Sequence, residues 1–328
     1  MNVEKHFGSS GDFGDVIYLL PLLQSFEKTR LSLYDRPWTK KISSRYHVFE
    51  PLLSAQPYIQ EVTLTEESAP LDLSTFRPDY KPTQSLLASQ CAHGKKKYGL
   101  PIVKGDTPWL FVNKAKETKG RVVIARSPRY HNDLFPWKTV LNHYGQSVLF
   151  VGLSEEHEDF SKKFGRVEHR PVKDLLELAE LIAGSELFVG NQSSPYAIAE
   201  GLKHPRILEC NLRVPDCIFP NGGQICYDGR LDYLPAVGKR KRVEFTKDIK
   251  FRKDDWMCCP PGQWQYPGYK TQNDINALAQ IVAREVGCKV PEARQAVYQF
   301  NCERLPDYFK DNVGAIYDRV LKAIQAAK

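Results

Sequence analysis

Residues 187–209 read LFVGNQSSPYAIAEGLKHPRILE, a stretch that contains a complete strand–loop–helix–strand unit. It begins with apolar residues typical of a buried strand and continues into a small polar loop. Pro195 suits the first turn of the following helix, and Ser193 or Ser194 suits the position that caps it. A second strand is predicted at 206–209. The unit therefore predicts parallel strands joined by a helix, as in α/β proteins.

The same alternation extends along the chain on the N-terminal side. It predicts strands that end at Phe7 and at 31–34, 61–64, 109–112, 121–125 and 147–151, and helices at 15–28, 48–55, 84–92, 137–144, 155–164 and 172–183. The polar stretch 113–120 (NKAKETKG) interrupts the pattern and is the best linker. We therefore expect two Rossmann-like lobes with a cleft between them, residues 1–115 and 120–306. Ligands of such sheets bind at the carboxyl ends of the strands.

Length and composition agree with a two-domain globular protein. The chain has 328 residues, of which 42% are hydrophobic and 26% charged. Such a composition argues against disorder. The net charge of +7 is mildly basic. It suits an anionic partner, which leaves a phosphorylated small molecule, an anionic glycolipid and nucleic acid open.

The first residues and the cysteines indicate a cytoplasmic protein. The start MNVEKHFGSSGDFGD lacks the positive-then-apolar pattern of a signal peptide, and its apolar run at 16–23 is too short to span a bilayer. We expect the eight cysteines to be free thiols, because no secretory signal precedes them. No C-x-x-C pair occurs, so free thiols are favoured over a zinc site, for which Cys210, Cys217, Cys226 and the Cys258–Cys259 pair are the candidates.

Several enzyme classes lack their sequence signatures here. The chain has no P-loop, no H-E-x-x-H and no G-x-S-x-G. Gly8, Gly11 and Gly14 are spaced G-x-x-G-x-x-G, which differs from the dinucleotide fingerprint. No D-x-D is present, an acidic pair expected of a sugar transferase that holds its donor through a divalent metal ion.

The loop at 8–14 (GSSGDFG) is the first candidate site. Its glycines allow close approach of a ligand to the backbone and positive φ angles. Asp15 lies at the expected start of a helix, where it or Asp12 is able to act as a simple helix cap. A cap alone does not explain three glycines, so we favour a functional loop, with Gly11 and Gly14 shaping an acceptor site. In that role Asp15 is the better proton acceptor and Asp12 the second choice.

The loop at 190–194 is the second candidate site. Asn191, Gln192, Ser193 and Ser194 precede a helix, whose free N–H groups and dipole form a phosphate site that needs no metal. A plain strand–loop–helix connection explains the same residues equally well. Glu209 ends the next strand and suits ribose hydroxyls, unless it is simply a solvated acid.

Two arginines form the third candidate site. Arg126 and Arg129 follow the strand at 121–125, at the edge where the second site lies. Arginines there are suited to clamp a diphosphate. The basic runs 95–97 and 239–242 are suited to a nucleic-acid backbone, but such runs are more often solvated surface.

Two motifs resemble those of the heptosyltransferase-like glycosyltransferases. They are G-D-V-I followed by L-L-P near the N-terminus, and LIAGSELFVGNQSSPYAIAEGL around residue 190. The resemblance implies a GT-B fold: an acceptor-binding first lobe, a nucleotide-sugar-binding second lobe and a terminal helix, here 307–328, that crosses back to the first lobe. It also implies a transferase that inverts the sugar carbon and needs no metal or other cofactor.

Carried over by position, the family's catalytic aspartate falls on Asp15. The family's D-[ST]-G loop falls on residues 191–194, where an amide replaces the acid and the glycine is missing. The family's lysine before a W-P pair is also absent, so Arg126 or Arg129 would supply that positive charge. These departures leave the donor's sugar and base open.

The resemblance implies direct displacement. Asp15 would take the proton of the acceptor hydroxyl, and the nucleoside diphosphate would leave towards the helix at Pro195 and the two arginines. The acceptor is expected to be a saccharide or glycolipid, with a hydroxylated DNA base as the alternative. A nucleotide-sugar epimerase or hydrolase and a non-catalytic nucleic-acid-binding protein are the remaining possibilities.

Overall fold

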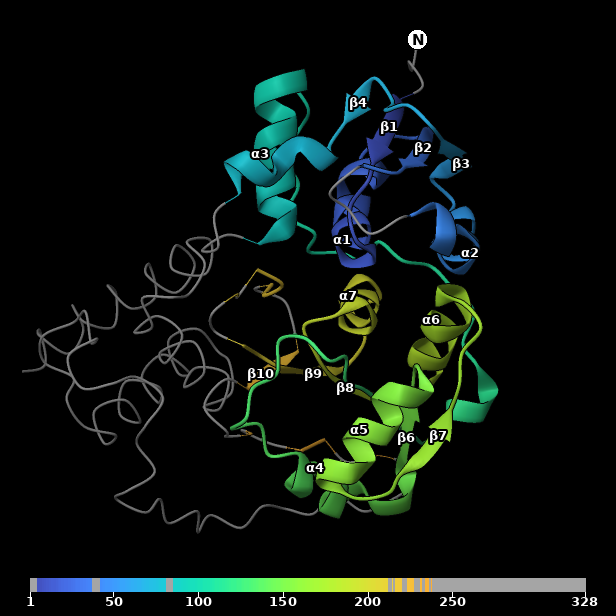
Figure 1. Cartoon of the computed structure of the whole chain (residues 1–328), viewed down its shortest axis with the longest axis vertical. Coiled ribbons are helices and arrows are strands. Elements are labelled where there is room, and N and C mark those ends of the chain that lie inside the picture. The colour runs from blue at the N-terminus through green and yellow to red at the C-terminus, as the bar shows by residue number, and fades with distance from the viewer. Residues whose placement is uncertain are drawn as a thin grey trace, which may run out of the picture.

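Two parallel β-sheets form the framework of the protein, as Figure 1 shows for the computed structural model of the chain. The structure describes residues 5–36, 42–80, 85–211, 214, 216–219, 223–226, 231, 234–235 and 237. Three predicted features lie outside these residues: the basic run 239–242, the crossing helix at 307–328 and the cysteines Cys258, Cys259, Cys288 and Cys302.

The first sheet has its described strands in the order β3-β2-β1-β4, all parallel. Its elements are β1 (Lys5–Ser9), α1 (Phe13–Gln24), β2 (Thr29–Tyr34), η1 (Ser43–Arg45), α2 (Tyr46–Ser54), β3 (Ile59–Thr65), β4 (Leu71–Asp72), η2 (Ser74–Asp79) and α3 (Leu86–Tyr98), where η marks a 3₁₀ helix. The chain moves outward from β1 to β3 and then returns to place β4 on the other side of β1. The segments after β1 and β4 are therefore neighbours at the carboxyl edge.

The second sheet has its described strands in the order β10-β9-β8-β5-β6-β7, again all parallel. Its elements are η3 (Lys116–Thr118), β5 (Val122–Ala125), α4 (Trp137–Tyr144), η4 (Gly145–Ser147), β6 (Val148–Val151), α5 (Ser154–Phe164), β7 (Glu168–Arg170), α6 (Leu175–Gly184), β8 (Leu187–Asn191), α7 (Ser194–Gly201), β9 (Arg206–Glu209) and β10 (Gln224–Cys226). The direction of strand addition reverses between β5 and β8. In open α/β sheets such a reversal is where ligands bind.

One hydrophobic core joins the two sheets. Helices α1 and α2 of the first sheet contact α7 and α6 of the second, which Figure 1 shows one above the other. The core runs from Phe7 on β1 through these helices to Val123 and Phe188 on the second sheet. The alternate residues of β5, Val122 and Ile124, face a separate core on the far side of the second sheet. The parallel α/β architecture predicted from the sequence is confirmed.

The predicted strand at 109–112 is wrong. This segment crosses between the two halves, and its backbone groups bond to neighbours other than strands. Trp109 and Leu110 donate their N–H groups to the carbonyl of Gly201, at 2.8 and 3.1 Å. The hydroxyl of Tyr58 donates to the Trp109 carbonyl at 2.5 Å. Trp109 and Leu110 are buried because they fill the junction between the halves, whereas Phe111 is 44% exposed.

The predicted linker at 113–120 is fastened to α6. Thr118 is fully buried, and its hydroxyl donates to the carbonyl of Leu181 at 2.8 Å. The Ala115 N–H donates to the carbonyl of Glu180 at 3.0 Å. Gly184 allows this approach, because a Cβ there would lie 2.1 Å from the Ala115 carbonyl oxygen. The connection is polar in sequence but packed in structure.

Candidate active site

A cavity of about 200 Å³ lies where the carboxyl edges of both sheets face each other. The start of α1 contributes Asp12, Gly14 and Asp15, and the second sheet contributes Arg129, Gln192 and Ser193. Residues from three of the predicted loops therefore meet at one place. Strand order explains the meeting, because the loops after β5 and β8 are neighbours at the reversal point.

Asp15 is held in the first turn of α1 as a nearly buried carboxylate. Its side chain is 11% exposed, and both oxygens accept hydrogen bonds from Nη2 of Arg77, at 2.7 and 2.6 Å. Burial raises the pKa of Asp15, and the Arg77 guanidinium opposes that rise. The amide of Gln90 also donates to the Asp15 backbone carbonyl at 2.7 Å, which fixes this turn of the helix. The result is an oriented carboxylate suited to accept a proton.

Asp12 occupies the N-cap position of α1, but its side chain makes no capping hydrogen bond. Its oxygens instead lie 3.4 Å from Nη2 of Arg45 and 3.5 Å from Nη1 of Arg129. The simple capping role is therefore not what the structure shows for this residue. Asp12 connects an arginine of the first half with an arginine of the second.

The glycines of the first loop serve different purposes, and none of them has a positive φ. That part of the expectation is wrong. Gly11 is needed because a Cβ there would lie 2.6 Å from the Cβ of Asp15. Gly14 lines the cavity, and a Cβ there would meet no protein atom within 4 Å. Gly11 thus makes room for the carboxylate, and Gly14 leaves space for a ligand.

The N-terminus of α7 opens into the same cavity through Ser193 and Ser194. Ser193 is the N-cap residue, yet its hydroxyl makes no capping bond and donates to the Asn191 carbonyl at 3.2 Å. The first N–H groups of a helix have no partner inside the helix. With the helix dipole, they favour an anion at this end.

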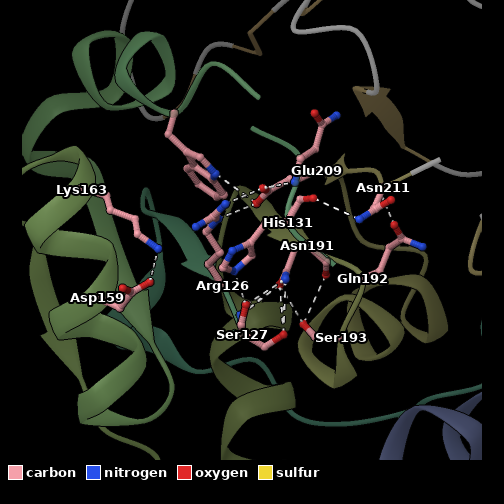
Figure 2. A network of polar contacts seen from close by, with 12 residues as sticks. Arg126, Ser127, His131, Asp159, Lys163, Asn191, Gln192, Ser193, Glu209 and Asn211 are labelled. Carbon is pink, nitrogen blue, oxygen red and sulfur yellow. Dashed lines mark hydrogen bonds and ion pairs between the residues drawn. The ribbon is translucent and has the colours of Figure 1, made fainter. Parts of the chain in front are cut away.

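Asn191 does not face the cavity. It is fully buried, and its amide donates to the backbone carbonyls of Ser127 and Arg129 while its oxygen accepts from the Ser127 N–H at 3.0 Å. Figure 2 shows the contacts between Asn191 and Ser127. Its role is to attach the loop after β5 to the end of β8, which places Arg129 at the cavity. Asn191, which we expected to contact the donor, instead supports the loop that carries Arg129.

Arg126 and Glu209 bond each other, which does not fit the expectation that each contacts the donor separately. Nε and Nη2 of Arg126 each lie 2.8 Å from a Glu209 oxygen, and the two side chains are 4% and 0% exposed (Figure 2). Glu209 also accepts from Nε1 of Trp137 at 3.0 Å and from the Asn132 N–H at 2.8 Å. Its acceptor capacity is used by the protein, so the pair fastens β5, β9 and the loop at 126–132 together.

Gln192 fixes the segment that follows β9. Its oxygen accepts from the N–H of Asn211, and its amide donates to the carbonyl of Val214. That segment carries Asp216, whose carboxylate also lines the cavity. Burial raises the pKa of Asp216 to about 6.

Three functional candidates escaped the sequence reasoning: Arg45, Arg77 and Asp216 line the cavity, together with Tyr130 of the loop after β5. Arg45 precedes α2, and Arg77 follows the two-residue strand β4, which is too short to show a periodic pattern. Tyr130 has a φ of 56°, an uncommon angle for a residue with a side chain. Only their spatial neighbours mark these residues, so no local motif was there to find.

The described basic run lies away from the cavity. Lys95, Lys96 and Lys97 form the last turn of α3, where positive charge complements the helix dipole. Nζ of Lys97 lies 5.0 Å from the centre of the Tyr98 ring. Interaction with the helix dipole and with the Tyr98 ring accounts for these lysines without a nucleic-acid partner.

The described residues contain no group of three or more His, Cys, Asp or Glu able to hold a metal ion. In that part of the chain Cys91, Cys210, Cys217 and Cys226 are buried and form no disulfide bond. No helix within it is long and apolar enough to cross a bilayer.

Comparison with known proteins gives structural likeness only. No family model matches the chain. No curated protein matches it either. Similar solved structures include the E. coli heptosyltransferase WaaC with ADP, at 13% identity and a TM-score of 0.49, covering 68% of this chain and 93% of that one. The glycosyl transferase of family 9 from Veillonella parvula DSM 2008 has 11% identity and a TM-score of 0.48, covering 69% and 86%.

The E. coli ADP-heptose LPS heptosyltransferase II has 15% identity and a TM-score of 0.41, covering 68% of this chain and 89% of that one. Two of these three structures carry the heptosyltransferase name, the family that the sequence motifs resemble. All three TM-scores are below 0.5, so the function is inferred from this chain's own residues and contacts.

Proposed function

We propose that this protein is a glycosyltransferase that moves a sugar from a nucleotide-sugar donor to a hydroxyl group of a saccharide or glycolipid. One observation carries the proposal: a single cavity holds an oriented carboxylate, Asp15, opposite the N-terminus of α7. A carboxylate suits the acceptor hydroxyl, and a helix N-terminus suits the phosphate of the leaving group. The resemblance of the two motifs points to the same division of roles.

The reaction follows from this arrangement as a direct displacement. Asp15 accepts the proton of the acceptor hydroxyl while the oxygen forms a bond to the anomeric carbon. The bond between that carbon and the phosphate oxygen breaks, and the nucleoside diphosphate leaves with the electron pair. A single displacement inverts the configuration of the anomeric carbon.

The leaving group is stabilised by charges that the protein already holds in place. The free N–H groups at Ser193 and Ser194 face its phosphates, and Arg129 lies at the same cavity. These groups take the role that a divalent ion has in metal-dependent transferases, so the proposed reaction needs no metal. Arg126 and Glu209 are assigned to support of the loop instead of direct donor contact.

The two sheets correspond in this proposal to the acceptor lobe and the donor lobe of a GT-B enzyme. Asp15 belongs to the first sheet and α7 to the second, so catalysis requires both halves. A terminal helix at 307–328 that crosses back to the first lobe completes the proposed arrangement.

A donor screen tests the function directly. Purified protein is mixed with candidate nucleotide sugars and acceptors, and mass spectrometry follows nucleotide release and the glycosylated product. We expect release to require an acceptor. Failure of calorimetry to detect binding of UDP, ADP and GDP alike would contradict the proposal.

Asp15→Asn tests the assigned proton acceptor. The amide keeps the size of the side chain but does not accept the proton, so we expect kcat to fall by about 100-fold or more. Nucleotide binding by calorimetry should stay close to wild type, because the phosphate site lies on α7. Asp159→Asn is a matched control, since Asp159 forms an exposed pair with Lys163 on α5. Normal turnover by Asp15→Asn would show that another group is the base.

A further inference from the structure

Arg77 is held between the proposed base and two aromatic rings. Its guanidinium is bonded to Asp15, and the same group lies 4.7 Å from the ring centre of Phe76 and 5.4 Å from that of Tyr80. The arginine side chain is nevertheless 51% exposed. A half-exposed guanidinium has many accessible rotamers, so the rings help to keep it against Asp15.

Tyr80 is fixed in turn by a residue of the second half. Its hydroxyl donates to Oδ2 of Asp216 at 2.8 Å. The Asp216 carbonyl accepts from the Leu86 N–H, also at 2.8 Å, so the segment is tied to the start of α3. Contacts therefore run without a break from Asp216 through Tyr80 and Arg77 to Asp15.

We propose that Asp216 is a positioning residue for Asp15: through Tyr80 it keeps Arg77 against the base, and its negative charge makes the Asp15 carboxylate a stronger proton acceptor. The role depends on the proposed function, because it concerns the base of that reaction. The physical reason for this role is the charge of Arg77. An aspartate paired only with an arginine is a weak base, and a second carboxylate beside the arginine offsets part of the positive charge.

The electrostatic coupling of the two carboxylates supports this role. Burial is the main cause that raises the pKa of Asp216 to about 6, and the charge of Asp15 adds to the rise while Arg77 and Tyr80 oppose it. Linked groups affect each other equally, so an ionised Asp216 adds to the basicity of Asp15, whose pKa the charge of Asp12 also raises. The other titratable groups that line this cavity are Asp12, Tyr18, Arg45, Arg129, Tyr130 and Cys217.

The sign of the effect is set by the proton that Asp216 loses. As the pH rises through about 6, Asp216 becomes ionised and its new negative charge strengthens the base. The wild-type kcat should therefore rise in this range. Asp216→Asn keeps an oxygen for the Tyr80 hydroxyl but removes the charge. We expect it to lose the limb near pH 6 and to have a kcat at pH 8 that is lower on the order of threefold, with KM for the donor unchanged.

Two further variants separate charge from geometry. Tyr80→Phe retains the ring on Arg77 but removes the hydrogen bond that lowers the pKa of Asp216. We therefore expect a lower kcat, with the limb still present but displaced to higher pH. It also serves if Asp216→Asn fails to fold. Asp159→Asn makes the same acid-to-amide change on α5, at a residue that does not line the cavity, and should leave the profile unaltered. A pH profile of Asp216→Asn identical to wild type would overturn the proposal.

Carboxyl ¹³C NMR of aspartate-labelled protein tests the coupling without any turnover. In Asp15→Asn the Asp216 signal should titrate at a lower pH than in wild type, because the charge of Asp15 is gone. An unchanged Asp216 titration would overturn the proposal even if the transferase is active. A wild-type protein that transfers no sugar would refute the proposed function, while this titration would still decide whether the two carboxylates are coupled.

Discussion

At the scale of single residues, the site depends on groups whose surroundings give them a role that their type alone does not. Asp15 and Glu209 are both acidic residues near strand ends, yet Asp15 lines a cavity and Glu209 is fully buried among four donors. The difference lies in their neighbours. Each Glu209 oxygen accepts two hydrogen bonds from the protein, so this carboxylate supports the structure. The Asp15 carboxylate lines a cavity, so it is available to a ligand.

Gly14→Ala should impair activity without harming the fold. Alanine favours a helix over glycine, and the added methyl group meets no protein atom within 4 Å, so the melting temperature should stay the same or rise. The methyl group would enter the cavity, and we expect kcat/KM to fall by about tenfold or more. Thermal melting and steady-state kinetics check both parts. Full activity would show that the ligand does not approach α1 at this position.

His204 should give the protein a measurable acid sensitivity. Burial, with Arg206 nearby, lowers the pKa of this imidazole to about 4, whereas an unfolded histidine titrates near 6.5. As the pH falls, His204 of the unfolded chain therefore binds its proton at a higher pH than His204 of the folded protein does. This contribution to stability is present above pH 6.5 and is lost as the pH falls towards about 4, by up to about 3 kcal/mol.

Urea unfolding of wild type and His204→Gln from pH 7 to pH 4 measures this effect. The free energy of unfolding should fall more steeply with decreasing pH in wild type than in the variant. Taking the difference cancels the opposite contribution of Asp216, which both proteins retain. Parallel curves would show that His204 has no linked proton.

At the scale of elements, the loop after β5 is held by a buried ion pair and an amide. Arg126 and Glu209 join β5 to β9, and Asn191 joins the loop to β8. The loop carries Arg129 to the cavity and contains Tyr130 at a positive φ. Residues held in uncommon backbone conformations persist where the surroundings fix them, and the ion pair and the Asn191 amide supply that constraint.

Glu209→Gln should destabilise the protein strongly. The change leaves the Arg126 guanidinium buried without a matching charge, which costs about 3–5 kcal/mol. Glu168→Gln is the matched control: its carboxylate bonds Arg121 at 2.7 Å but is 63% exposed, and exposed pairs contribute about 1 kcal/mol or less. Urea midpoints compare the two. Equal midpoints for the two variants would mean that the buried pair adds little.

At the scale of the whole molecule, the site exists because two sheets present their carboxyl edges to each other. The halves are joined by α1 against α7 and by the crossing segment that contains Trp109. A lost contact at this junction therefore affects both the fold and the distance between Asp15 and the helix N-terminus.

Gly201→Ala should loosen the junction. The same substitution at Gly14 is expected to leave the fold intact, but a Cβ at Gly201 would lie 2.7 Å from Leu110 and 2.8 Å from Nε1 of Trp109. Overpacking of this kind costs about 1–3 kcal/mol. Hydrogen exchange should show faster exchange in both α1 and α7. Exchange that rises in α7 alone would show that the halves do not depend on each other.

The sequence predicted most of the elements because their signals are local. Strands β5 and β9 and helix α4 lie within a residue of the predicted bounds, since apolar runs and helical spacing decide them. The two-residue strand β4 carries no such pattern. The segment at 109–112 resembles a strand because Trp109 and Leu110 are apolar residues that fill the junction between the halves. The candidate loops were found, but Arg77 and Asp216 were missed because they act through partners distant in the chain.

By itself the sequence determined the alternation of strands and helices, the three loops at the carboxyl edges and the presence of a carboxylate at the start of α1. Only the tertiary structure decided which charged groups pair. Arg126 and Glu209 form a buried ion pair with each other, whereas Asp15, Arg77 and Asp216 line one cavity. The physical reason is strand order: local residues specify a strand, but the neighbours of its carboxyl end depend on how the whole sheet is assembled.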